Sequence, residues 1–89
     1  MSENPTIALV LIKTELGMAR QVADATAELP NVFWTIVVTG PYDVVAAVKV
    51  ENNLGLADLV IDQIQKIDGV HNPTTLVGVH INVGVEPFP

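Results

Sequence analysis

The chain has 89 residues, 49% of them hydrophobic, and its ten acidic and four basic side chains give a net charge of −6. A domain of this size buries only about 60–65% of its unfolded surface, so this apolar share predicts an oligomer with surface covered between subunits. The acidic balance, with no cluster of basic residues, argues against nucleic-acid binding. The absence of cysteine excludes disulfides and thiolate chemistry.

The first residues carry no sign of a targeting segment. Met1–Pro5 is acidic and contains a proline, whereas a signal peptide begins with basic residues. No apolar run approaches the roughly 20 residues that span a bilayer. We therefore expect a soluble, cytoplasmic protein with no membrane partner.

The first half of the chain predicts a strand, a helix and a second strand. Ile7–Ile12 is an uninterrupted apolar run, typical of a strand that is covered on both faces. Apolar residues recur at helical spacing over Glu15–Leu29, and Pro30 favours an end there because a residue before proline avoids the helical region. Val32–Thr39 is rich in β-branched and aromatic residues and predicts a strand. We expect its aromatic residues to fill the core: Phe33 and Trp34.

The second half repeats this order. Val44–Val50 predicts a strand, Leu56–Ile67 has apolar residues at helical spacing, and Thr74–Val83 predicts the last strand. Asn53 is the expected N-cap of the second helix and Gly69 its C-cap. The chain thus looks like a doubled β-α-β unit. Right-handed closure of both units predicts an α+β, ferredoxin-like β-α-β-β-α-β domain, a four-stranded antiparallel sheet with two helices on one face.

The predicted domain is single, covers residues 1–89 and has its core at about 6–83. Its architecture leaves the second face of the sheet without helices, although both alternating residue sets of the first strand are apolar. Two sheets packed face to face would cover these surfaces, which predicts a dimer. After Val83, a glycine and two prolines rule out a regular central strand, and we expect a frayed end in preference to an arm on a neighbouring subunit.

Residues that carry chemistry concentrate between the second and third strands, in Thr39–Asp43. Gly40 lets a ligand or a backbone approach, Pro41 fixes one dihedral angle, and Asp43 offers a negative charge. The same residues would also form an ordinary type I turn in which Asp43 accepts from nearby backbone donors. The residue types alone leave both interpretations open.

A free α-amino acid fits this loop better than a reaction does. Its ammonium group needs an acceptor and its carboxylate needs donors. Asp43 would supply the acceptor, and backbone N–H groups around Gly40 with a threonine hydroxyl would supply the donors. The candidate threonines are Thr39, Thr74 and Thr75.

Other site chemistry finds little material in the sequence. The only serine is Ser2, and no serine or cysteine lies near a histidine, which argues against nucleophilic catalysis. His71 and His80 are nine residues apart and would lie on opposite faces of an extended strand. They cannot share an ion within one chain, and we expect neither a metal nor a cofactor.

The loop Thr39-Gly40-Pro41-Tyr42-Asp43, the strand that follows it, and Ile67-Asp68-Gly69-Val70 ahead of Thr74-Thr75 closely resemble the ligand-binding domain of the Lrp/AsnC regulators. The resemblance spans Ile7 to about Val83. It implies subunits that pair through their sheets and assemble into larger rings such as octamers, with an amino acid bound between dimers near this loop. It also implies an effector site made of Gly40, Tyr42 and Asp43. Three threonines are weaker candidates for the same site: Thr39, Thr74 and Thr75.

The chain departs from the family pattern in three places. Only about six residues precede the first strand, where the family's regulators carry a helix-turn-helix, so we expect a stand-alone domain without a DNA-binding module. Pro41 occupies a position that is often acidic in full-length regulators, and it supplies no N–H. The stretch His71-Asn72-Pro73 differs from the usual approach to the last strand.

These observations predict an oligomeric amino-acid-binding module, not an enzyme, that modulates transcription through a full-length Lrp/AsnC regulator. The alternative is a small dimeric α/β-barrel enzyme that uses Tyr42, Asp43 or His80 as an acid or base in a deep pocket. A third interpretation is an assembly part with no ligand. An enclosed cavity containing His80 would favour the enzyme, and a shallow site shared between dimers would favour the binding module.

Overall fold

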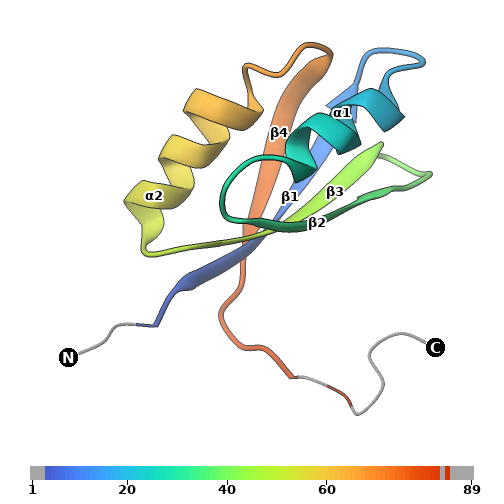
Figure 1. The fold of residues 1–89 in the computed structure, drawn as a ribbon. Coiled ribbons are helices and arrows are strands. Elements are labelled where there is room, and N and C mark those ends of the chain that lie inside the picture. Colours follow the sequence, from blue (N-terminus) through green and yellow to red (C-terminus); the bar gives the residue numbers. More distant parts are fainter. Residues whose placement is uncertain (1–3, 83, 85–89) are drawn as a thin grey trace.

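The computed structural model describes residues 4–82 and 84. Both helices lie on one face of a four-stranded antiparallel sheet with strand order β2-β3-β1-β4 (Figure 1). This arrangement confirms the predicted ferredoxin-like fold. No helix in the described part of the chain is long and apolar enough to cross a membrane. The elements are β1 (Thr6–Thr14), α1 (Ala19–Ala27), β2 (Val32–Val37), β3 (Val44–Val50), α2 (Asn53–Asp58), its π-helical continuation η1 (Leu59–Ile64) and β4 (Val70–Val77).

The core lies between the sheet and the helices. Alternate residues of the two central strands point toward the helices, as the period of two in a strand requires. Three helical elements contribute the opposite side of this layer, mainly through aliphatic side chains. The buried cluster consists of Ala8, Val10, Ile12, Val22, Ala23, Val44, Ala46, Val48, Val50, Leu56, Leu59 and Ile64.

The first helix is shorter than the sequence predicts. It begins at Ala19 instead of Glu15, and it ends at Ala27. Gly17 has a φ of 82°, which is incompatible with a right-handed helix, and Leu16 is fully exposed. The helical spacing of residues 15–18 is therefore accidental, because these residues form the turn between β1 and α1.

The second helix is capped by Asn52, one residue before the predicted Asn53. The Asn52 side chain accepts a hydrogen bond from the N–H of Gly55 at 2.9 Å. The helix then widens in η1, where the N–H of Gln65 donates to the carbonyl of Val60, five residues earlier, at 2.8 Å. The wider turn brings Leu59 and Ile64 into the core, a spacing that a regular helical period does not predict.

Gly69 lies in a turn. It is not the C-cap that the sequence predicts for the second helix. The second helix ends at Ile64, and Gly69 follows in the connection to β4 with a φ of 93°. A Cβ atom at this position would lie 2.8 Å from the Cε atom of Met18. Both the conformation and the close contact favour glycine.

The last strand starts and ends earlier than predicted. It covers Val70–Val77, so His71-Asn72-Pro73 lies within the strand and not ahead of it. Its pairing with β1 shifts between Leu11 and Lys13, where the chain accommodates an extra residue. Proline is tolerated there because β4 is an edge strand. The predicted end at Val83 and the predicted frayed tail, apart from Gly84, lie outside the described residues.

The second face of the sheet is apolar and exposed in the single chain, as the sequence predicts. Leu9, Ile36 and Leu76 are 38–49% exposed. The expected burial of Phe33 and Trp34 is wrong for the single chain. Trp34 pairs with Ala47 on the uncovered face, and Phe33 lies at a bulge of β2 and is 58% exposed.

Candidate functional site

The loop between β2 and β3 is tied to one end of the sheet. The N–H of Asp43 donates to the carbonyl of Ile12 at 2.9 Å, and the N–H of Val38 donates to the carbonyl of Asp43 at 2.9 Å. Gly40 has a φ of 134°, and apart from its two chain neighbours no residue lies within 4 Å of the position that its Cβ would occupy. Glycine is therefore favoured at this position by the backbone conformation, and the space above the loop is open.

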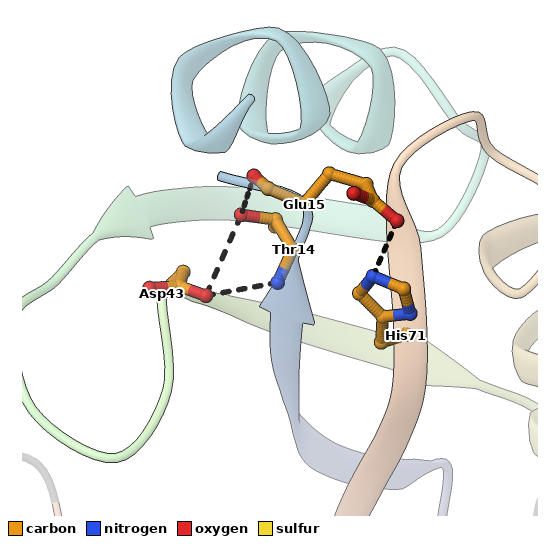
Figure 2. A network of polar contacts seen from close by, with 4 residues as sticks. All are labelled: Thr14, Glu15, Asp43 and His71. Carbon is orange, nitrogen blue, oxygen red and sulfur yellow. Dashed lines mark hydrogen bonds and ion pairs between the residues drawn. The ribbon is translucent and has the colours of Figure 1, made fainter. Parts of the chain in front are cut away.

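The Asp43 carboxylate connects this loop to the end of β1. Its Oδ2 atom accepts from the Thr14 N–H at 2.8 Å and from the Thr14 hydroxyl at 3.4 Å (Figure 2). Asp43 therefore bonds a backbone donor, as the turn interpretation requires, but the donor belongs to a distant strand. Both contacts use Oδ2, and no hydrogen bond to Oδ1 is present within the described residues.

Tyr42 joins the loop to β4. Its hydroxyl donates to the Thr74 hydroxyl at 3.2 Å, across 32 positions of the chain. Thr74 is paired with Leu11 and so lies on the uncovered face of the sheet, at the same end as the loop. The hydrogen bond leaves the O–H of Thr74 free to donate elsewhere.

The predicted site residues do not all converge. The structure brings Gly40, Tyr42, Asp43 and Thr74 to one end of the sheet, with Thr39 exposed in the same loop. Thr75 pairs with Val10 and lies on the helix-covered face, where it lines a hollow of about 320 Å³ beside α2 and η1. Alternation along β4 therefore separates the two adjacent threonines.

Four polar residues at this end were not singled out as site residues. Thr14 holds Asp43, and Glu15 Oε2 lies 2.8 Å from His71 Nε2, with both side chains about half exposed (Figure 2). Lys13 is exposed and stands opposite His71 in the β1–β4 ladder. The sequence held one signal that could have pointed to the residues at the end of β1. The predicted antiparallel pairing of the first and third strands places the end of β1 beside the start of β3.

His80 lies far from this site. It follows β4 and lines an open hollow of about 260 Å³ with Pro5 and Ile7, at the end of the sheet where β1 begins. Asp43 and Tyr42 lie at the end where β1 finishes, so His80 cannot act with them within one chain. Among the residues that the structure describes, no group of three or more His, Cys, Asp or Glu side chains could hold a metal ion.

The fold defines a small ferredoxin-like α+β domain, and comparison with known proteins gives its family. The profile of the Lrp/AsnC ligand binding domain matches residues 7–80. The chain therefore belongs to the Lrp/AsnC family, and the resemblance seen in the sequence is confirmed.

Individual relatives agree with this assignment. An uncharacterised HTH-type transcriptional regulator of Pyrococcus abyssi is 32% identical over 75 residues, which are 81% of this chain and 50% of the relative. The chain spans about half the length of the curated relatives that it matches.

Solved structures share the fold. The crystal structure of TTHA0845 from Thermus thermophilus has a TM-score of 0.81 and 34% identity over 89% of this chain and 99% of that chain. The complex of the transcriptional regulator NMB0573 of Neisseria meningitidis with L-Met has a TM-score of 0.81 over 94% of this chain and 56% of that chain, at 16% identity. The latter likeness concerns the fold alone.

Proposed function

We propose that this protein is an oligomeric amino-acid-binding module that acts in transcriptional regulation through a full-length Lrp/AsnC regulator. Membership of a ligand-binding family whose relatives are transcriptional regulators supports an effector-binding role. The observation that carries the proposal is the convergence of Asp43 with the hydrogen-bonded pair Tyr42 and Thr74 beside the open space at Gly40.

These groups are complementary to a zwitterion. The Oδ1 atom of Asp43 accepts from the ammonium group, while its Oδ2 atom stays bonded to Thr14. The Thr74 hydroxyl donates to the ligand carboxylate, because Tyr42 already occupies one of its acceptor positions. Loop N–H groups around Gly40 add further donors, whereas Pro41 has none.

The assembly completes the site in this proposal. Each subunit pairs with a second through the apolar second face of its sheet, and the dimers form a larger ring of octamer type. The site residues lie partly exposed at the surface of a single chain, so a neighbouring dimer can close over a bound ligand. A site shared in this way fits a binding module better than a catalyst, which requires a group such as His80 close to the loop.

In this proposal the domain binds the effector and makes no DNA contact of its own, because its net charge of −6 disfavours contact with phosphates. A full-length regulator then supplies the DNA contact by co-assembly.

Asp43→Asn tests the site directly. Asparagine retains an oxygen that can accept from the Thr14 N–H, so the loop stays in place while the negative charge is lost. We expect affinity for the best-stabilising amino acid to fall by about 1.5–3 kcal/mol, the range for hydrogen bonds to charged groups. Calorimetric titration measures the affinity and thermal melting measures the fold.

The matched control is Asp62→Asn, which removes an exposed carboxylate from η1, away from the loop. We expect it to leave affinity unchanged. A well-folded Asp43→Asn protein that binds as tightly as the control would show that Asp43 is a turn residue only.

A further inference from the structure

The residues of the candidate site carry only one charge, and this charge is negative. Asp43 is the charged member, whereas Tyr42 and Thr74 contribute neutral hydroxyl groups. A free amino acid carries two charges, and hydrogen bonds to an ionised group are roughly twice as strong as those between neutral groups. A cation beside Thr74 would therefore complete the recognition of a zwitterion.

Lys13 lies on the same face of the sheet as Thr74. Ile12 is buried against the helices, so the next residue of β1 points to the uncovered face, where Lys13 is exposed. Leu11, two residues before Lys13 on that face, pairs directly with Thr74. Diagonal neighbours on paired strands lie about 7–8 Å apart, which is within reach of a long side chain.

The same lysine lies beside Asp43 on the other side of β1. Ile12 pairs with Val44, so a continued register places Lys13 opposite Asp43, on strands that lie about 4.8 Å apart. Figure 2 shows Asp43 on one side of the end of β1 and His71 on the other. Lys13 thus lies between the acceptor for an ammonium group and the hydroxyl of Thr74.

Lys13 forms no ion pair with the described residues, although two carboxylates lie at this end of the sheet. Asp43 is turned to the N–H of Thr14 at 2.8 Å, and Glu15 is paired with His71 at 2.8 Å. The second lysine of the uncovered face differs, because Lys49 Nζ lies 5.8 Å from the centre of the Phe33 ring. The ammonium group of Lys13 is therefore available to an anion.

We propose that Lys13 binds the carboxylate of the amino acid whose ammonium group binds to Asp43. This inference rests on the proposed function, and it narrows the ligand to molecules with both an ammonium group and a free carboxylate. The two charges of an α-amino acid are attached to one carbon, so they fit side chains of opposite charge on neighbouring strands. Lys13 also compensates for Pro41, which has no N–H to offer a carboxylate.

The experiment compares each common amino acid with its own α-carboxamide, which keeps the ammonium group and lacks the negative charge. Thermal melting of the full-length protein finds the amino acids that bind, and calorimetric titration measures both members of each pair. We expect the carboxamide to bind the natural protein about 10- to 100-fold more weakly than the amino acid, the range for hydrogen bonds to charged groups.

Lys13→Gln removes the charge and keeps an N–H donor. We expect it to weaken binding of the amino acid at least about tenfold and to leave binding of the carboxamide unchanged, so that the preference for the free carboxylate is lost. Lys13→Arg retains the charge and should retain the preference. A purely structural role would not produce this pattern, because it would affect both members of the pair equally.

Lys49→Gln is the matched control, since it makes the same change on the same face of the sheet. Lys49 pairs with Ile7, six residues before Lys13, and so lies about 20 Å away along the sheet. We expect it to leave the preference for the free carboxylate intact.

The outcomes separate this inference from the proposed function. If Lys13→Gln weakens binding of the amino acid and the carboxamide equally, or weakens neither, the role of Lys13 is overturned and the amino-acid site stands. If no amino acid raises the melting temperature of the natural protein, the proposed function is overturned and the role of Lys13 with it.

Discussion

The Asp43 carboxylate uses one of its two oxygens for a contact in the structure. Oδ2 holds the end of β1 through Thr14, and in the proposed function Oδ1 accepts from the ligand. A residue of this kind cannot be assigned from the sequence, because its type suits a turn and a binding site equally. The test variant must therefore keep the structural contact while it removes the charge, which asparagine does.

The sequence singled out Asp43 as a candidate residue, but it did not reveal the partner of its carboxylate. Thr14 lies 29 residues away, and its contact depends on the register of β1 against β3. The same holds for the pair His71 and Glu15, which only the fold brings together. Loop composition therefore singled out the candidate loop and missed the residues that support it.

Thr26 offers a test at a residue outside the site. Its side chain is fully buried in α1, and its hydroxyl has no hydrogen-bond partner among the described residues. Thr26→Val replaces the hydroxyl with a methyl group of similar size and should stabilise the fold by about 1 kcal/mol. Urea unfolding at fixed protein concentration measures the change.

The control for this prediction is Thr35→Val. The Thr35 hydroxyl donates to the carbonyl of Ala23 at 3.0 Å, so its loss should destabilise the protein by about 1 kcal/mol. Equal destabilisation by both substitutions would mean that the Thr26 hydroxyl has a partner in solution.

At the scale of elements, the order and the faces followed from the sequence while several of the ends did not. The sequence predicted the strand Val44–Val50 with the bounds that the structure shows, because its apolar run is short and ends in polar residues. The ends of α1 depended on the left-handed backbone of Gly17, and the buried residues of η1 depended on a π-helical turn. Neither feature leaves a periodic signal.

The N-cap of α2 provides a test of one such boundary. Asn52 accepts from the N–H of Gly55, whereas the neighbouring Asn53 is the first residue of the helix. Asn52→Ala should lower the free energy of unfolding by about 1 kcal/mol, the usual cost of losing a cap. Asn53→Ala should have a smaller effect, and the reverse order in urea unfolding would place the cap one residue later.

The whole molecule has apolar surface on both sides of its sheet but helices on only one. Trp34, Ile36 and Leu76 are exposed on the uncovered side, an arrangement that a stable monomer of this size rarely shows. The sequence predicted this surface from its apolar share and from the two apolar residue sets of the first strand. It could not say that Phe33 and Trp34 belong to it, because a buried strand and an interface strand have the same composition.

Light scattering during size exclusion tests the consequence. We expect a mass of at least two chains at micromolar concentration, because the uncovered face needs a partner of similar area. One chain has a mass of 9.5 kDa. A species of that mass over the whole concentration range would remove the structural argument for the dimer.

In the proposed function the assembled protein binds a free amino acid. Thermal melting against a panel of all the common amino acids tests it most directly, because a ligand that binds only the folded state adds RT ln(1 + [L]/Kd) to its stability. At a hundredfold excess over Kd this is about 2.7 kcal/mol, and we predict an upward shift in melting temperature for at least one amino acid. A panel in which every amino acid leaves the melting temperature unchanged at millimolar concentration would show that the protein does not bind a free amino acid.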